Sequence, residues 1–194
     1  TETLTCTVPA GTTATAVDVV VTTPGGTATS TGGYTYNPAP VITTIDPDEG
    51  PVAGGNTLTI TGSNLTGATV EIDGNACTPV TVNLAGTSLT CTVPAGTDPG
   101  AVDVAVTTTE GGTTTSTGAY TYVGLPSAAA IDPSSGPTTG GQTVTITGTN
   151  FEFATSVTIG GAACTNLTWN ANEQELTCTT PPGTAGTTTV LVTT

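Results

Sequence analysis

The chain has 194 residues, with 14 Asp and Glu but no Lys, Arg or His, and its formal net charge is −14. Without cationic side chains it cannot neutralise phosphates or anionic headgroups, so we expect neither nucleic-acid binding nor attraction to a membrane surface. Catalysis that needs an imidazole, a lysine amine or an arginine is excluded as well. No apolar run approaches the ~18 residues of a membrane-spanning helix, so we expect no membrane insertion in this segment.

One internal repeat of about 86 residues accounts for the whole sequence. The octapeptide LTCTVPAG occupies residues 4–11 and again residues 89–96, an offset of 85. The tripeptide Tyr-Thr-Tyr occupies residues 34–36 and again residues 120–122, an offset of 86. Agreement between separate landmarks is not expected by chance, so the sequence predicts tandem copies of one domain.

The phase of the repeat predicts three domain segments. Residues 1–38 match the C-terminal part of a repeat, residues 39–124 form a complete repeat, and residues 125–194 form a third repeat lacking its last strand. The first residue is Thr and no signal sequence is recognisable, so we expect a piece of a longer polypeptide. Two explanations of the incomplete ends stay open: a trimmed array, which we favour, or an incomplete repeat that borrows a strand from another chain.

Within the complete repeat the apolar residues alternate, as in the sequence TLTIT at residues 57–61. A period of two is typical of half-buried strands, and Gly, Pro, Asn and Asp clusters separate the runs. No segment has a helical pattern. Seven short strands are predicted near residues 41–45, 56–62, 68–72, 77–82, 87–93, 101–108 and 117–123. This number of strands in about 86 residues predicts an all-β fold of tandem immunoglobulin-like β-sandwiches.

The five cysteines follow the same repeat. Cys77 and Cys91 are 14 residues apart within one repeat, as are Cys164 and Cys178 in the next, which predicts the disulfides Cys77–Cys91 and Cys164–Cys178. Cys6 matches Cys91, so we expect it to pair with a residue before the segment. Zinc binding is the alternative, but thiolate zinc sites use CxxC-type clusters and the sequence has none. Disulfides indicate an extracellular location, at the cell surface or secreted.

The opening of each repeat resembles an IPT/TIG domain. Residues 41–62 carry the pattern VI-x-x-I-x-P-x-x-GP-x-x-GG-x-x-LTI-x-G, and residues 130–148 carry AI-x-P-x-x-GP-x-x-GG-x-x-VTI-x-G. The later LTCT-x-P element and the closing Tyr-x-Tyr strand also fit. The resemblance implies an immunoglobulin-like module, found in plexin-type receptors, some transcription factors and bacterial surface proteins. Because that family includes spacers, ligand-binding modules and dimerisation modules, the resemblance leaves the function open.

Three acidic residues form a candidate calcium site. Asp46, Asp48 and Glu49 crowd one turn and could supply the hard oxygen ligands that calcium prefers. In the next repeat only Asp132 matches an acidic residue. A turn-capping role for the aspartate before each proline is therefore the favoured explanation, and we expect no metal.

Aromatic residues are candidates for packing or ligand contact. Trp169, the only tryptophan, aligns with Val82 and is predicted to pack in the core rather than to form a sugar platform. The two Tyr-x-Tyr pairs each point to one face of a strand and are predicted to close the sandwich. Asn64 and Asn166 begin matches to the N-glycosylation pattern and are candidate modification sites.

These features favour a structural function. We expect the repeats to form part of an extracellular stalk or filament on a microbial cell surface, with copies of the chain assembling into a fibre. One alternative is an adhesin or receptor-type module that recognises a surface glycan or protein. A further alternative is a set of spacer domains in a secreted polysaccharide-degrading enzyme. We expect no enzymatic activity and no cofactor in this segment, because its acids are scattered and no nucleophile–base pair can be built.

Overall fold

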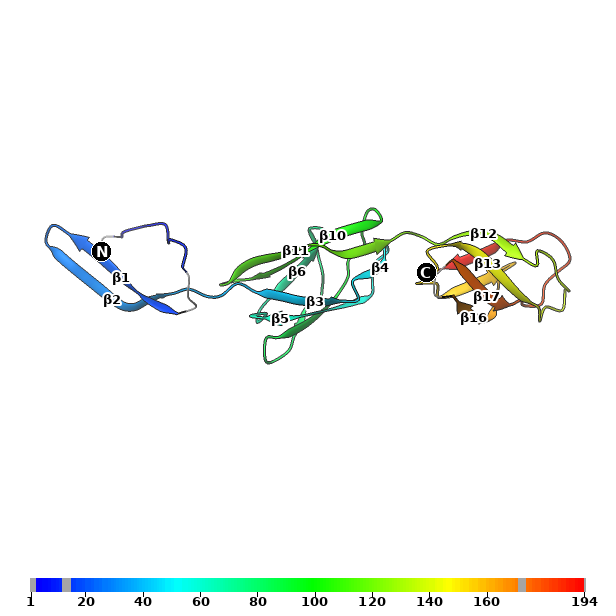
Figure 1. The fold of residues 1–194 in the computed structure, drawn as a ribbon, viewed down its shortest axis with the longest axis horizontal. Coiled ribbons are helices and arrows are strands. Elements are labelled where there is room, and N and C mark those ends of the chain that lie inside the picture. Colours follow the sequence, from blue (N-terminus) through cyan, green and yellow to red (C-terminus); the bar gives the residue numbers. More distant parts are fainter. Residues whose placement is uncertain (1–2, 12–14, 171–173, 194) are drawn as a thin grey trace. The chain divides into compact units, whose positions relative to one another are not determined.

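The computed structural model describes residues 3–11, 15–170 and 174–193, and its described residues form strands and no helix. Figure 1 shows the strands in sequence colours. Within the part of the chain described, no helix is long and apolar enough to cross a membrane. Because the described residues form strands and no helix, the all-β prediction is confirmed.

The N-terminal part is a two-stranded hairpin. β1 (Ala16–Thr23) pairs antiparallel with β2 (Gly26–Thr35), and the register shifts between Val17 and Val19. Every residue of β2 is exposed, and β1 has only one partly buried position. This hairpin has no core of its own.

The middle repeat contains a four-stranded sheet in the order β3-β5-β9-β8. Buried and more exposed residues alternate along its strands, and the buried ones form the core. Leu58 pairs with Cys91 and Ile60 pairs with Leu89, and all four side chains are at most 2% exposed. The sequence at 57–61 therefore places its apolar residues inward, as predicted. The strand bounds are Val41–Asp46 (β3), Thr57–Ser63 (β5), Thr81–Val82 (β8) and Ser88–Thr92 (β9).

A second sheet of the middle repeat has the order β4-β11-β10-β6-β7. β6 pairs antiparallel with β10, whereas β4 pairs parallel with β11. Val70 and Ile72 of β6 and Val104 and Val106 of β10 are buried. The strand bounds are Glu49–Pro51 (β4), Thr69–Ile72 (β6), Asn75–Ala76 (β7), Gly100–Thr108 (β10) and Gly112–Val123 (β11).

One predicted strand of this repeat is wrong. Residues 77–82 do not form a continuous strand, because β7 ends at Ala76 and β8 contains only Thr81 and Val82. Pro79 lies between them, and a proline cannot donate a hydrogen bond to a strand ladder.

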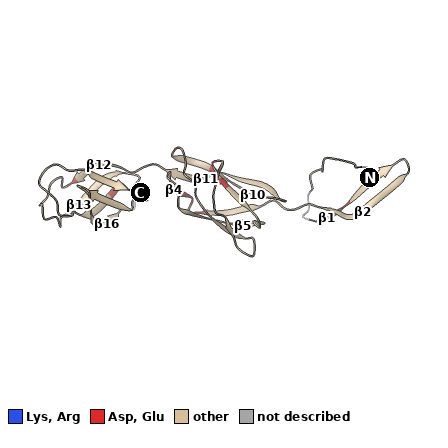
Figure 2. Ribbon diagram, turned by 180° about the vertical axis from the view of Figure 1, so that it is seen from behind, with Lys and Arg blue, Asp and Glu red and all other residues tan. Residues whose placement is uncertain are grey.

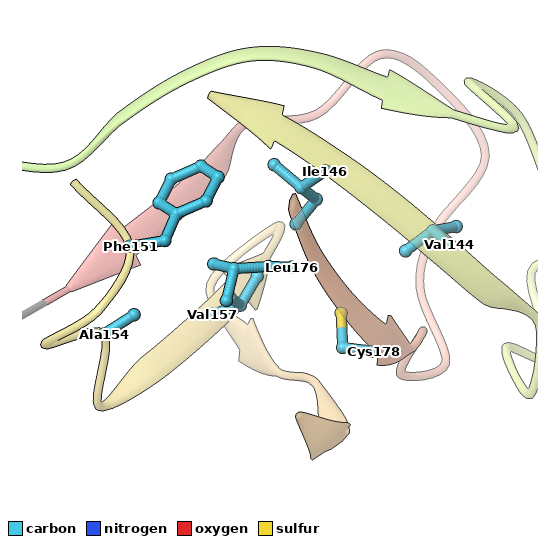
Figure 3. Close-up of a cluster of buried hydrophobic side chains, with 7 residues drawn as sticks. All are labelled: Val144, Ile146, Phe151, Ala154, Val157, Leu176 and Cys178. Atoms are coloured by element: carbon cyan, nitrogen blue, oxygen red, sulfur yellow. The ribbon is translucent and has the colours of Figure 1, made fainter. Parts of the chain in front are cut away.

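The third repeat has its own core. One sheet has the order β12-β13-β17-β16 and the other β15-β14-β18. Seven buried side chains gather in this repeat: Val144, Ile146, Phe151, Ala154, Val157, Leu176 and Cys178 (Figure 3). The strand bounds are Ser127–Asp132 (β12), Thr143–Thr149 (β13), Ser156–Ile159 (β14), Ala162–Ala163 (β15), Thr165–Trp169 (β16), Glu175–Thr179 (β17) and Val190–Thr193 (β18).

Candidate functional site

An asparagine holds the linker that leads into the middle repeat. Asn64 directly follows β5 with φ of 58°, and its Nδ2 donates a hydrogen bond to the carbonyl oxygen of Ala39 at 3.0 Å. Asparagine adopts this left-handed conformation more readily than most residues. The next residue, Pro40, is buried, and its carbonyl accepts a hydrogen bond from Thr114 Oγ1 at 2.6 Å. The linker is thus attached to the repeat that follows it.

The third repeat attaches its own linker in the same way. Asn150 directly follows β13 with φ of 59°, and its Nδ2 donates to the carbonyl oxygen of Leu125 at 3.0 Å. Asn64 and Asn150 are 86 residues apart, which is the length of one repeat, so this hydrogen-bonded linker anchor is a feature of each repeat.

A glycine two residues before each asparagine permits this arrangement. A Cβ on Gly62 would overlap the carbonyl oxygen of Val41, and a Cβ on Gly148 would overlap that of Ser127. In both repeats the first strand is also irregular near this contact, with register shifts between Ile42 and Thr44 in β3 and between Ala128 and Ala130 in β12. The close approach requires glycine.

An open groove of about 580 Å³ lies beside the first linker. Asn37 Nδ2 donates to Glu110 Oε2 at 3.0 Å, and the backbone N–H of Gly111 donates to Thr108 Oγ1 at 3.2 Å. Glu110 is the only charged residue of the lining, so the groove has no nucleophile–base pair. The polar contacts in the groove hold the linker. The groove is lined by Asn37, Pro38, Asn64, Thr66, Thr108, Thr109, Glu110 and Gly111.

The Tyr-x-Tyr pair of β11 is in the core, as predicted. Tyr120 and Tyr122 are 0% and 1% exposed, and their rings meet edge to face with centroids 5.2 Å apart. The Tyr120 hydroxyl and the Asn56 side chain are hydrogen-bonded at 3.1–3.2 Å, and Tyr122 Oη donates to the carbonyl of Pro94 at 2.8 Å. Burial raises the pKa of Tyr120, so its hydroxyl stays protonated and can donate.

The matching pair in the hairpin differs. Tyr34 is 41% exposed, although its ring contacts Tyr36 at 5.1 Å between centroids. Tyr36 Oη donates to the carbonyl of Pro9 at 2.8 Å, as Tyr122 does to Pro94. The same motif is therefore buried in a complete repeat and half exposed in the hairpin.

The cysteines follow the prediction only in the middle repeat. The Cys77–Cys91 disulfide is present, with Cα atoms 5.5 Å apart. Cys164 and Cys178 are neighbouring free thiols in the structure, so the predicted Cys164–Cys178 disulfide is not formed there. Burial raises the pKa of Cys178 to about 12, which keeps it in the protonated form that does not attack another sulfur. Cys6 is an exposed free thiol, and its partner before the segment stays a prediction.

The acidic side chains are the remaining candidates for a metal site. Figure 2 shows them at separate positions along the ribbon, with no Lys or Arg. Within residues 3–11, 15–170 and 174–193, no group of three or more His, Cys, Asp or Glu could hold a metal ion. The calcium site of Asp46, Asp48 and Glu49 thus gains no support. Asp18 has a structural contact instead, because its Oδ1 accepts a hydrogen bond from the Gly32 backbone N–H at 2.8 Å.

The prediction that Trp169 packs in the core is wrong, because its side chain is 53% exposed. The alignment with Val82 holds, since Trp169 pairs with Leu176 as Val82 pairs with Leu89. However, β16 is an edge strand of its sheet, and the indole is much larger than a valine side chain. The tryptophan therefore offers an aromatic surface to solvent.

The two candidate glycosylation sites are exposed but differ in position. Asn64 forms the linker anchor described above. Asn166 lies in the irregular part of β16 with φ of 54°, and its Nδ2 donates to Thr179 Oγ1 at 3.2 Å. Their glycosylation stays a prediction.

Comparison with known protein families identifies the family of this chain. The IPT/TIG domain family matches residues 40–122 and 126–194, which is most of the chain. The chain belongs to the IPT/TIG family. The two matches agree with two adjacent immunoglobulin-like β-sandwiches.

Solved structures of two other proteins are similar to this chain. The extracellular region of plexin A4 has 26% sequence identity and a TM-score of 0.56, over 84% of this chain and 17% of the plexin chain. A surface glycan-binding protein, SGBP-B, from a xyloglucan utilization locus of Bacteroides uniformis has 26% identity and a TM-score of 0.39, over 81% of this chain and 46% of that protein. The chain therefore spans about a sixth and just under half of these two proteins.

The linker anchor of these IPT/TIG repeats was missed by sequence reasoning. A signal was present, because Ser63-Asn64 and Thr149-Asn150 end corresponding strands 86 residues apart. We considered Asn64 only as a glycosylation acceptor, since the pattern Asn-x-Thr is visible in a sequence whereas a left-handed backbone is not.

Proposed function

We propose that this chain is a structural segment of tandem IPT/TIG repeats, divided at residues 1–38, 39–124 and 125–194, that serves as an extracellular stalk on a microbial cell surface. The linker anchors carry this proposal: Asn64 and Asn150 each bind the backbone of the linker before their own repeat. A linker fixed at its attachment limits the freedom of the joint, which suits a spacer that holds another part of the protein away from the cell.

The chemistry of the chain supports an extracellular location. A disulfide persists in oxidising compartments, and the Cys77–Cys91 bridge is part of the middle repeat. The absence of Lys and Arg leaves no site for proteases that cleave after basic residues. We propose no catalytic activity for this segment.

The test of the spacer proposal is the order of the linker. In the Asn64→Gly variant the left-handed conformation is retained without cost, but the hydrogen bond to Ala39 is lost. We expect the {1H}–15N heteronuclear NOE of Asn37 and Ala39 to match that of the strands in the wild type and to fall clearly below it in the variant. The linker before the third repeat serves as the control, because Asn150 still binds Leu125. A wild-type linker with NOE values of a free chain would contradict the proposal.

The exposure of Trp169 favours a second candidate function, a binding module for a surface glycan. An indole that is 53% exposed on an edge strand can stack on the apolar face of a sugar ring. Polar neighbours are in place, since Asn170 Nδ2 donates to Glu175 Oε2 at 2.9 Å beside it.

A glycan array with the wild type and the Trp169→Ala variant tests this candidate. If the chain binds a glycan here, Trp169→Ala should weaken binding by about tenfold or more, as expected for a central aromatic contact, and Trp169→Phe should retain part of it. Leu84→Ala is the matched control, because Leu84 is a fully exposed apolar residue of the other repeat. Equal binding by all four proteins, or no binding by any, would exclude Trp169 as a glycan platform.

A further inference from the structure

The strand pairs β8–β9 and β16–β17 correspond between the two repeats and end in the same way. In the middle repeat the backbone N–H of Asn83, which follows β8, donates to the carbonyl oxygen of Ser88 at 2.9 Å. In the third repeat the backbone N–H of Asn170, which follows β16, donates to the carbonyl oxygen of Glu175 at 3.1 Å. The backbone at this end of the sheet is therefore common to both repeats.

Two side chains at this end differ in chemistry between the repeats. Trp169 occupies the place of Val82, and Glu175 occupies the place of Ser88, both at an offset of 87. The middle repeat makes the same strand pair with a valine and a serine, so the fold requires neither an aromatic ring nor a carboxylate here. Both replacements are exposed to solvent in the third repeat. They therefore point to contact with a ligand rather than to stability.

The indole and the carboxylate lie at the same end of β16. Asn170 directly follows Trp169, and its Nδ2 donates to Glu175 Oε2 at 2.9 Å. Successive residues of an extended chain point to opposite faces, so the indole and the Asn170–Glu175 pair flank the edge of the sheet. A ligand that contacts both must reach across this edge. An oligosaccharide is long enough to do so, whereas a single sugar is not.

A groove of about 300 Å³ lies on the carboxylate side. The hydroxyls of Ser127, Thr147 and Thr149 and the amide of Gln174 line it together with Glu175. Hydroxyl and amide groups suit the hydroxyls of a sugar, and the volume is at the lower end of the range of ligand pockets. Glu175 is the only charged residue among the described residues that line this groove.

The charge at this site selects the kind of sugar. The chain has no Lys, Arg or His, so none of its side chains supplies a positive charge to neutralise Glu175. A carboxylate can accept several hydrogen bonds, so the one from Asn170 leaves capacity for a ligand. The face of an indole also attracts cations. Both groups thus favour a positively charged ligand, and the net charge of −14 disfavours an anionic one.

We propose that the third repeat binds an oligosaccharide of amino sugars in their protonated form. One sugar ring stacks on Trp169, and an ammonium group of the same oligosaccharide donates a hydrogen bond to the Glu175 carboxylate. Neutral sugars make the stacking contact without the ion pair, and acidic sugars are repelled. The inference rests on the second candidate function proposed above, the glycan-binding module, and names its class of ligand.

Calorimetric titration with three oligosaccharides of equal length, built from glucosamine, N-acetylglucosamine and galacturonic acid, tests the proposal at mildly acidic pH and low ionic strength. The glucosamine oligomer should bind about fivefold more tightly than the N-acetylated one, as expected for an exposed ion pair, and the acidic oligomer most weakly. Glu175→Gln keeps the hydrogen bond from Asn170 but removes the charge, and should reduce this preference to about twofold or less. Free glucosamine should not bind measurably.

The matched control is Glu71→Gln, which removes the same charge from the exposed side of a strand in the middle repeat. It should leave the preference unchanged. Equal loss of preference in both variants would show non-specific attraction to an acidic chain and would overturn the proposal, as would binding of free glucosamine as tight as that of the oligomer.

The remaining outcomes separate this inference from the function on which it rests. Equal binding of the glucosamine and N-acetylglucosamine oligomers, both weakened about tenfold or more by Trp169→Ala, would overturn the choice of ligand but support the glycan-binding module. Tighter binding of the acidic oligomer would also overturn the choice of ligand. No binding of any of the three oligomers would overturn both.

Discussion

The Gly62→Ala variant is expected to lose about 3 kcal/mol of the stability of the middle repeat. The added Cβ would overlap the carbonyl oxygen of Val41, and both groups belong to the backbone, so no side chain can turn aside. The Gly62 N–H also donates to the carbonyl of Thr87 at 2.9 Å, which holds the backbone in place from the other side. Hydrogen–deuterium exchange read by mass spectrometry, peptide by peptide, measures the loss in this repeat.

The matched control is Gly67→Ala. Gly67 has φ of +68°, but a Cβ there would meet no atom within 4 Å. The substitution therefore adds only the cost of a left-handed alanine, about 1 kcal/mol. A Gly62→Ala variant as stable as Gly67→Ala would show that β3 can move away from β5, and the close approach would no longer explain the glycine.

The strand pattern and the fold were predictable from the sequence because burial follows the alternation. Leu58 and Ile60 are separated by a threonine and both are fully buried, and Tyr120 and Tyr122 are buried by the same period of two. The short parallel strand β4 was missed, because it consists of three residues and depends on its partner β11 rather than on its own sequence.

The candidate sites were less predictable because they depend on geometry. The exposure of Trp169 follows from the place of β16 at the edge of a sheet, and strand order is not visible in a repeat alignment. The Cys164–Cys178 prediction relied on spacing alone, and spacing does not fix the chemical state of two neighbouring thiols. The linker anchors required the backbone conformation of Asn64 and Asn150.

Reduction of the Cys77–Cys91 disulfide is expected to destabilise the middle repeat by about 3 kcal/mol. The bridge links two cysteines with a sequence separation of 14. A crosslink that closes a loop of about 15 residues lowers the conformational entropy of the unfolded chain, and this stabilises the folded state by roughly 3 kcal/mol, which reduction removes. For a small domain this is a large share of a total stability of about 5–15 kcal/mol. Peptide-resolved hydrogen exchange with and without a reductant measures the change, and a Cys77→Ala/Cys91→Ala variant should show it without reductant.

The third repeat is the internal control for this prediction. Cys164 and Cys178 occupy matching positions but are not bonded, so the reductant removes no crosslink there. Exchange in β13 and β17 should stay unchanged while exchange in β5 and β9 increases. Equal destabilisation of both repeats would mean that Cys164 and Cys178 are bonded in the native protein, and an unchanged middle repeat would mean that its packed core already restricts the loop without the sulfur bridge.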